Sequence, residues 1–340
     1  MEGASSFTDL NYLINTQYSS NDTITLSRNY TFNGTDDDSG FIDGIGINRG
    51  VTIDGQNHVL DGANFSRILL ISHANVTLKN MVFVNGFADD GGAIHLKNST
   101  LLISNCTFIH NRANAGGGAL YASLSNASIA ESSFSYNCGE GLYVSGGAVH
   151  LYNSTANFSN SIFLNNTADA GGAVFALRSS LNINGSEFSY NTANFYGGGV
   201  FSEFFLKINS TVFHDNKAGL KGGAIHGSYL TEDNCIVNVN NSMLFNNHAQ
   251  YGGAVSSSNG GRNLIQNSRL YSNTATYGAV IARFSENSID IVNCDCSDNE
   301  AVNGTVVYAP SCGNVALKNS NFTNNSGKYG SLIYTIQGAG

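Results

Sequence analysis

The chain has 340 residues, of which only 11% are charged, with 39 Gly, one Pro, no Trp and a formal net charge of -9 at pH 7. The negative charge comes without basic clusters, which excludes nucleic acids and anionic membrane surfaces as partners. No run of 18 apolar residues occurs, and the first residues lack a charged segment followed by an apolar one. We therefore expect neither direct membrane insertion nor a signal peptide in this segment.

The first residues predict a short cap. Apolar side chains recur there at helical spacing, at Phe7, Leu10, Leu13 and Ile14. Ser5 or Ser6 can cap a helix that starts at this point. We expect residues 1–20 to form an N-terminal cap whose amphipathic helix covers the open end of a strand-rich domain in residues 21–340. Such a cap shields strand edges that would otherwise recruit other chains.

Residues 21–82 predict irregular strands. Thr23 to Phe32 alternates between polar and apolar residues, and further strand-like segments run from Gly50 to Gly62 and from Ile68 to Gly86. Between the first two stands the acidic run Asp36-Asp37-Asp38. Clustered carboxylates can bind a hard cation, but a solvated loop is the simpler interpretation and the one that we prefer.

Residues 83–340 repeat one unit of about 26 residues, a length at which one repeat is one supersecondary unit. An apolar residue, mostly Phe, marks each unit: Phe83, Phe108, Phe134, Phe163, Phe188, Phe213, Leu244, Leu270, Cys296 and Phe322. An Asn follows three residues later in all units but the first: Asn111, Asn137, Asn166, Asn191, Asn216, Asn247, Asn273, Asn299 and Asn325. A glycine pair and a small residue come next, as in Gly171-Gly172-Ala173.

The apolar spacing within each unit predicts strands. The residue five positions before the Phe slot is apolar in every unit, and the one seven positions before it is apolar in most. A spacing of two indicates a strand with one buried face, so each unit reads as three short strands, one upstream of the Phe, one at it and one after the glycine pair. Without helical segments, these units predict an all-β parallel β-helix. We expect about twelve coils, which at about 4.7 to 4.9 Å per coil make a rod roughly 55 to 60 Å long.

When the coils stack in register, residues at the same position of successive units lie above one another. The Phe residues become a core stack, and the nine Asn become a structural ladder whose amides hydrogen-bond along the axis, as in cross-β stacks. Cys106 and Cys294 occupy a slot that otherwise holds Ser, so we interpret them as members of a small-residue ladder, with Cys296 in the core. No second Cys-x-x-Cys and no adjacent His follows, so no zinc site is predicted.

Two sets of residues resemble known families. The pairing of Gly-Gly-Ala with Phe-x-x-Asn resembles the repeats of chlamydial polymorphic outer-membrane proteins, and TIDGQNHVLDG followed by VTLKNMVFVNG is similar to the opening segment of adhesin-like surface proteins of methanogenic archaea. The resemblance implies a right-handed parallel β-helix displayed outside the cell, with an adhesive role and no catalytic residue to carry over. Because the chain stops at Gln337-Gly338-Ala339-Gly340 without a cap or anchor, we expect a truncated C-terminal end, cut from a larger exported protein.

The acidic residues do not predict an active site. Parallel β-helices that cleave polysaccharides need two carboxylates, or carboxylates with a metal and a base, on facing positions of neighbouring coils. Acidic residues that share a slot lie several coils apart, as Asp215 and Asp298 do, and so do Glu187 and Asp295. With no acidic pair on adjacent coils, we predict no catalytic residue, no metal site and no cofactor.

One slot carries rings on consecutive coils. The position two residues after the small residue holds His95, Tyr121, His150, Phe175, Ser202, His226, Ser256, Ile281, Val307 and Ile333. The flanking positions are apolar enough to face the core, so alternation turns the first four outward, into a column that suits a sugar ring or an extended chain. His95 and His150 would then change affinity between about pH 5.5 and 7.5. A merely β-prone surface and a face covered by a loop remain alternatives.

Three functions follow from this pattern. The preferred one is a non-catalytic adhesin or binding module at the cell surface, whose partner is a surface glycan or a protein of another cell. A structural spacer and a carbohydrate-active lyase or glycosidase are the alternatives. The 17 Asn-x-Ser/Thr sequons, Asn126 and Asn153 among them, avoid the Asn ladder, as expected if ladder Asn are buried and loop Asn can be glycosylated.

Overall fold

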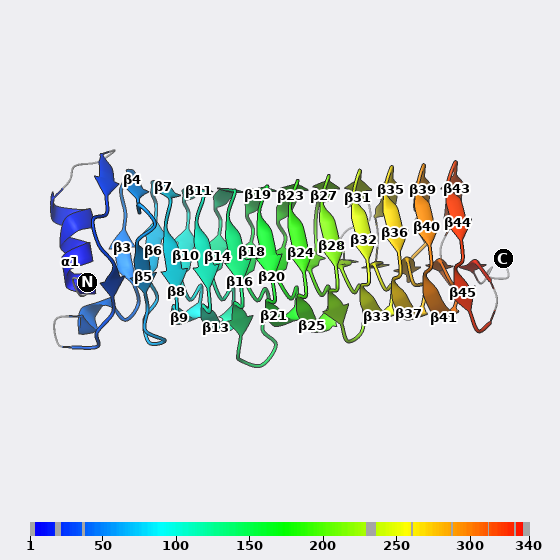
Figure 1. Cartoon of the computed structure of the whole chain (residues 1–340), viewed down its shortest axis with the longest axis horizontal. Coiled ribbons are helices and arrows are strands. Elements are labelled where there is room, and N and C mark those ends of the chain that lie inside the picture. Colours follow the sequence, from blue (N-terminus) through cyan, green and yellow to red (C-terminus); the bar gives the residue numbers. More distant parts are fainter. Residues whose placement is uncertain are drawn as a thin grey trace.

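The computed structural model describes residues 4–17, 22–35, 38–228, 236–259, 261–286, 288–311, 313–329 and 331–335. Its strands form one rod of stacked coils with the helix α1 (Phe7–Tyr12) at the N-terminal end (Figure 1). Three of its parallel sheets contain twelve strands each. The predicted all-β parallel solenoid of about twelve coils with a short N-terminal helix is thereby confirmed. No helix within these residues has the length and apolar character to cross a membrane.

We number the four sheets in the order in which one coil meets them. Sheet 1 holds β1 (Thr23–Thr25), β4 (Val51–Asp54), β7 (Asn75–Lys79), β11 (Thr100–Ser104), β15 (Asn126–Ala130), β19 (Thr155–Ser159), β23 (Ser180–Asn184), β27 (Leu206–Asn209), β31 (Ile236–Asn240), β35 (Arg262–Gln266), β39 (Ser288–Val292) and β43 (Asn314–Lys318). Sheet 2 holds β2 (Tyr30–Thr31), β5 (Val59–Asp61), β8 (Val82–Val84), β12 (Thr107–Ile109), β16 (Ser133–Ser135), β20 (Ile162–Leu164), β24 (Glu187–Ser189), β28 (Val212–His214), β32 (Met243–Phe245), β36 (Arg269–Tyr271), β40 (Asp295–Ser297) and β44 (Asn321–Thr323).

Sheet 3 holds β9 (Phe87–Asp90), β13 (Arg112–Gly116), β17 (Cys138–Gly139), β21 (Thr167–Ala170), β25 (Thr192–Tyr196), β29 (Lys217–Ala218), β33 (His248–Tyr251), β37 (Thr274–Tyr277), β41 (Glu300–Asn303) and β45 (Ser326–Gly327). Sheet 4 holds β3 (Ile45–Ile47), β6 (Leu69–Ser72), β10 (Ile94–Lys97), β14 (Leu120–Ser123), β18 (Val149–Tyr152), β22 (Val174–Leu177), β26 (Val200–Ser202), β30 (Ile225–Ser228), β34 (Val255–Ser258), β38 (Ile281–Arg283), β42 (Val307–Tyr308) and β46 (Ile333–Tyr334). Coils are counted by their sheet 1 strand, so that coil 1 holds β1 and coil 12 holds β43. A π-helix (Leu13–Gln17) and a 3-10 helix (Ser39–Phe41) complete the described elements.

The strands of sheet 3 were not predicted from the repeat pattern. Three strands per unit were expected, whereas coils 3 to 12 contain four. The segments of sheet 3 consist of small and polar residues, as in Thr167–Ala170, and lack the apolar alternation that marks a strand. From β13 on, each of these strands follows a ladder Asn, and a main-chain hydrogen bond joins its start to the coil before, as Thr167 N donates to Asn137 O (3.1 Å).

Left-handed backbone conformations form the corners of each coil. In coil 6, Asn160 and Asn165 turn the chain with φ of 47° and 52°, a conformation that Asn tolerates better than most residues. The corner between sheets 3 and 4 is the glycine pair. Gly171 has a φ of +61°, and a Cβ at Gly172 would collide with the carbonyl oxygen of Gly198 in the next coil. The pair therefore supplies both a positive φ and a close approach of adjacent backbones.

The Phe slot forms the centre of the core. In coils 3 to 8 it holds stacked rings whose neighbouring centres lie 4.4 to 4.9 Å apart and which are fully buried: Phe83, Phe108, Phe134, Phe163, Phe188 and Phe213. Leu244, Leu270 and Cys296 continue the column and are also fully buried. The main core is therefore one continuous apolar cluster along the rod, beside a small second cluster of Ala193, Ala218 and Ala249.

The Asn ladder runs without a break from Asn111 to Asn325. In its middle, Asn166 N and Nδ2 donate to Asn191 Oδ1 (3.0 and 2.9 Å). Asn191 Nδ2 in turn donates to Phe163 O (2.8 Å) and to Asn216 Oδ1 (3.0 Å). Each amide thus satisfies main-chain groups that the corner between sheets 2 and 3 would otherwise leave buried and unpaired.

The two cysteines of the small-residue ladder behave like its serines, as predicted. Cys106 N donates to Ser132 Oγ (3.1 Å) and Cys294 N donates to Ser320 Oγ (3.0 Å). Within the described residues, Cys106, Cys138, Cys294 and Cys296 are free thiols. Cys235 and Cys312 lie outside the described residues.

The predicted capping helix forms, with Ser6 as its N-cap. Asp9 N donates to Ser6 Oγ (3.1 Å) and Ser6 N donates to Asp9 Oδ2 (3.3 Å), which makes a capping box. Phe7, Leu10 and Ile14 are fully buried. The Phe7 ring lies 5.7 Å from that of Phe32, so the helix packs on the first coil.

Asp38 corrects the prediction of a solvated acidic loop. Its side chain is fully buried and accepts hydrogen bonds from the main-chain N of Phe7 (3.2 Å), Thr8 (2.9 Å) and Asn33 (3.0 Å). Burial alone would raise the pKa of this carboxyl, but the hydrogen bonds from Asn33, Thr8 and Phe7 outweigh it and lower the pKa. The acidic run thus ties the start of α1 to the first coil, while Asp36 and Asp37 lie outside the described residues.

Candidate binding surface

The predicted ring column lies on the outer side of sheet 4. Strand pairing places Tyr121 between His95 and His150, and His150 next to Phe175. Neighbouring ring centres are 4.9 to 5.0 Å apart, with angles of 57° to 65° between the ring planes. The four residues therefore form one continuous column on coils 3 to 6 in which each ring meets the next at a steep tilt. We call these residues the ring column.

The register corrects the later members of this slot. Phe201, rather than Ser202, pairs with Phe175, and His226 follows Phe201. Further along, the slot holds Ala282, Tyr308 and Tyr334 instead of Ile281, Val307 and Ile333. The sequence pattern assigned these members one residue away from their true position. In one unit Gly197-Gly198-Gly199 replaces Gly-Gly-Ala, and later units keep a single Gly, so the start of the count was ambiguous. Hydrogen bonds between coils remove that ambiguity.

Among the six consecutive rings from His95 to His226, the first three are the more accessible to solvent, and Tyr308 and Tyr334 near the C-terminal end are also partly exposed. His95, Tyr121 and His150 are half-buried, and the exposed fraction is 8% for Phe175, 7% for Phe201 and 3% for His226. Sheet 3 contributes to this cover, because the Tyr196 ring at the end of β25 lies 5.3 Å from that of His226. The expectation that Phe175 faces solvent is therefore wrong. Alternation decides on which side of a strand a residue lies, but not what packs against that side.

Burial keeps the histidines of this slot neutral. It lowers the pKa of His95 to about 4, an effect that the charges of Arg67 and Lys97 strengthen. Burial also lowers the pKa of His150 to about 4 and that of His226 to about 3. The expectation that His95 and His150 change affinity between about pH 5.5 and 7.5 is therefore wrong, because neither imidazole titrates in that range.

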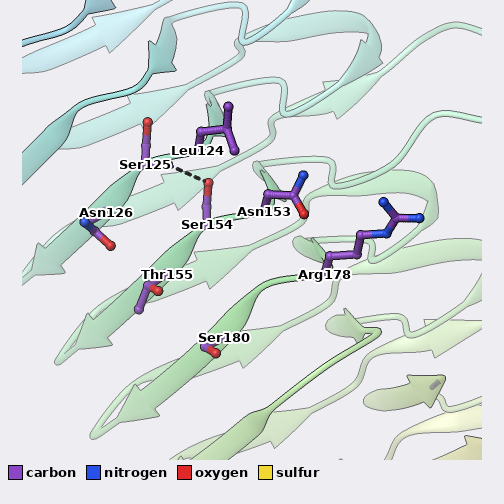
Figure 2. A pocket seen from close by; sticks show the side chains of 8 residues that line it. All are labelled: Leu124, Ser125, Asn126, Asn153, Ser154, Thr155, Arg178 and Ser180. Carbon is purple, nitrogen blue, oxygen red and sulfur yellow. Dashed lines mark hydrogen bonds between the residues drawn. The ribbon is translucent and has the colours of Figure 1, made fainter. Parts of the chain in front are cut away.

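A cleft of about 450 Å³ lies where β14, β18 and β22 turn from sheet 4 into sheet 1 (Figure 2). It is lined by Leu124, Ser125, Asn126, Asn153, Ser154, Thr155, Arg178 and Ser180. Figure 2 shows Leu124, Asn153 and Arg178 in equivalent places on three successive coils. The cleft thus offers amide, hydroxyl and guanidinium groups at the ends of the strands that carry Tyr121, His150 and Phe175. The repeat pattern did not predict it; the unusual Leu124 and Arg178 at corner positions with φ of 51° and 49° were the available signal.

A second set of rings, also not predicted, lies on the outer side of sheet 2. His214, Phe245 and Tyr271 pair in register on coils 8 to 10. Their ring centres are 4.9 and 4.8 Å apart and their planes are within 5° of each other. We call these three residues the ring stack. Each follows the Phe slot by one residue, and comparing that position between consecutive units could have found them.

An acidic pair on adjacent coils is present, contrary to the prediction that there is none. His214 Nε2 lies 3.2 Å from Glu187 Oε1 and His214 Nδ1 lies 2.7 Å from Asp215 Oδ2. The two carboxylates belong to different slots, which a search within single slots could not find. The imidazole occupies the space between them, where a glycosidase would need its sugar and a water molecule. This arrangement is a hydrogen-bond network that holds His214 rather than an open pair of carboxylates.

The fold and these surfaces define a parallel β-helix repeat protein. The family model described as right handed beta helix region matches residues 43–204, and the Chlamydia polymorphic membrane protein repeat matches residues 210–228. The second match contains Gly222-Gly223-Ala224 and agrees with the resemblance to chlamydial repeats noted in the sequence.

Similar proteins come from several organisms. The metabotropic glutamate receptor-like protein R of Dictyostelium discoideum is 39% identical over 93 residues, which cover 26% of this chain and 6% of that protein. PfbA, a surface adhesin of Streptococcus pneumoniae, has a TM-score of 0.39 at 13% identity over 93% of this chain and 78% of its own. The L. reuteri 53608 SRRP has a TM-score of 0.39 at 14% identity over 99% of this chain and 100% of its own. The chain spans only a small part of the Dictyostelium relative.

Proposed function

We propose that the chain is a non-catalytic binding module of an extracellular cell-surface protein, an adhesin that contacts a surface glycan or a protein of another cell. The observation that carries the proposal is the row of half-buried rings His95, Tyr121 and His150 on coils 3 to 5, next to a polar cleft on coils 4 to 7. Rings supply apolar contact area and the cleft supplies hydrogen-bonding groups, the combination that binding sites use.

The placement outside the cell rests on resemblance. The repeat matched at residues 210–228 is that of a membrane protein family, and a receptor-like protein contains a related stretch. The similarity of residues 50–86 to adhesin-like proteins of methanogenic archaea supports the same placement. A rod of about twelve coils also suits the presentation of a long face to a partner, because each coil is fixed by its neighbours.

A structural spacer is the second candidate, and the burial of Phe175 favours it. A side chain that packs against the protein's own rings is not available to a partner, so part of the ring column stabilises the rod. The two functions differ in one respect: a spacer has no surface whose alteration changes binding. A lyase or glycosidase receives less support, because His214 fills the space between Glu187 and Asp215.

Binding by the purified chain to glycan arrays and to intact cells tests the proposal. Arg178→Asn replaces the exposed guanidinium at the cleft with a short amide. Asn tolerates the positive φ of this corner. Tyr121→Phe removes only the hydroxyl of Tyr121, the central one of the three half-buried rings. We expect each variant to weaken binding about fivefold or more, as loss of a contact worth about 1 kcal/mol does.

The control is Tyr329→Ala, at an exposed tyrosine of coil 12 far from the cleft. It should bind like the parent. Binding that survives both Arg178→Asn and Tyr121→Phe places the contact elsewhere, and failure to bind any glycan or cell supports the spacer.

A further inference from the structure

The ring stack on sheet 2 is a rigid assembly. His214 lies between the carboxylates of Glu187 and Asp215, which fix its orientation from both ring nitrogens. Phe245 and Tyr271 then stack on it at the spacing of the coils, with planes 4° and 5° apart. All three side chains are partly exposed. The three rings are therefore already held in their stacked arrangement before a partner binds, which lowers the entropic cost of binding.

The ring stack ends abruptly at Tyr271. Strand pairing places Ser297 next to Tyr271 in coil 11, and Thr323 follows in coil 12. A ring at Ser297 would continue the stack at the same spacing, but serine carries only a hydroxymethyl group. One face of the Tyr271 ring is consequently not covered by a further ring of this column, in contrast to Phe245, which has a ring on each side.

Polar groups surround this position. The guanidinium carbon of Arg269 is 5.6 Å from the centre of the Tyr271 ring, and Arg269 Nε is 4.0 Å from Asp295 Oδ2. The two side chains are 64% and 41% exposed. The guanidinium thus lies over the Tyr271 ring, the two side chains present donors and acceptors to solvent, and as an ion pair they add no net charge.

We infer that the space above Ser297 is a subsite for one ring of a neutral saccharide. A pyranose has an apolar face of C–H groups that stacks on an aromatic ring, and an equatorial rim of hydroxyls that both donate and accept hydrogen bonds. The C–H face would lie on Tyr271, and Arg269, Asp295 and Ser297 would meet the hydroxyls. Arg269 and Asp295 contribute no net charge between them, which favours a neutral sugar over an anion or a cation.

This subsite lies on a different sheet from the ring column, and the inference does not depend on the ring column binding anything. It predicts that the saccharide occupies the place of the next ring in the stack. Filling that place from within the protein should therefore exclude the sugar, and Ser297→Tyr does so by extending the stack from coil 10 to coil 11. Because the new ring stacks on Tyr271, this variant should remain folded.

Saturation-transfer NMR and calorimetric titration with cellotetraose, maltotetraose and the tetramer of N-acetylglucosamine test the inference. We expect at least one of these probes to bind, and Tyr271→Ala and Ser297→Tyr each to weaken its binding about tenfold or more, the effect of removing a central aromatic contact. Ser135→Tyr introduces the same ring at the same slot in coil 5 and should bind like the parent. Thermal unfolding of each variant shows that the loss does not follow from unfolding.

Three results would overturn the inference. None of the three probes binds; or a probe binds equally to the parent and to Ser297→Tyr; or tyrosinamide, used as a planar aromatic probe, competes for the position better than any sugar. If binding is lost in Arg178→Asn and Tyr121→Phe but kept in Tyr271→Ala and Ser297→Tyr, this inference fails while the proposed function stands. The reverse pattern moves the contact surface from sheet 4 to sheet 2.

Discussion

Asn191→Ala tests the ladder that connects the coils. The substitution removes the acceptor of Asn166 N and of Asn166 Nδ2, and the donor to Phe163 O. Asn166 Nδ2 keeps its bond to Phe134 O (2.9 Å), so the groups most affected are Asn166 N and Phe163 O. At about 1 to 3 kcal/mol for each buried group left without a partner, we expect the free energy of unfolding to fall by about 2 to 6 kcal/mol.

Guanidinium unfolding followed by circular dichroism measures this change. A rod of coils can lose its end coils before its centre, so hydrogen exchange at the Asn166 amide provides a local check and should become faster. The control is Asn194→Ala in the same coil, whose exposed amide donates only to Asp169 Oδ1 (2.6 Å). We expect the control to remain within about 0.5 kcal/mol of the parent. Equal shifts for Asn191→Ala and Asn194→Ala would refute the reasoning.

Three further predictions concern the core, the ring column and pH. Phe188→Ala leaves a cavity between Phe163 and Phe213 and should lower the free energy of unfolding by about 3 to 5 kcal/mol; a parent-like unfolding midpoint would mean that the slot is not interior. Phe175→Ala should also destabilise, by about 3 kcal/mol, because the ring is buried and stacks on Phe201 at 4.6 Å; if it reduces binding without reducing stability, the ring faces a ligand instead. Burial lowers the pKa of His226 to about 3, so below about pH 6.5 this imidazole is protonated in the unfolded chain but stays neutral in the folded chain. Its contribution to stability is thus complete above about pH 6.5 and falls with pH by about 1.4 kcal/mol per unit toward pH 3, with His95 and His150 acting in the same direction. Unfolding of the parent and His226→Gln at pH 7, 6 and 5 should show the difference between them shrinking, and a constant difference contradicts the shift.

Much of the fold could be predicted because the same chemistry recurs in each coil. A Phe at one slot and an Asn three residues later indicate a buried stack and a buried amide ladder, and the apolar spacing of two indicates the strands. The fourth strand of each coil could not be predicted in this way, since Thr167–Ala170 and its equivalents are small and polar. The division at residue 20 between cap and solenoid stays a prediction.

The candidate site was less accessible to such reasoning. The outward rings could be identified from His95 to His150, but the later members of the slot depended on a register that an extra glycine at Gly199 obscured. The ring stack escaped notice because His214, Phe245 and Tyr271 occupy a slot that is not aromatic in other coils. The network around His214 joins two different slots, so no comparison of equivalent positions could reveal it.

The sequence by itself thus determined which residues are equivalent between coils at the Phe and Asn positions and that these positions lie in the core, because stacking in register makes the environment of each interior position the same. Only the tertiary structure decided which side chains outside the core are exposed and which groups they contact. Whether Phe175 is exposed depends on rings from other coils and on the corner between sheets 3 and 4, and the role of Asp38 depends on main-chain groups about 30 residues away in α1. Exterior contacts join parts of the chain that no periodic pattern relates, whereas the repeated hydrogen bonds and core contacts follow from the period itself.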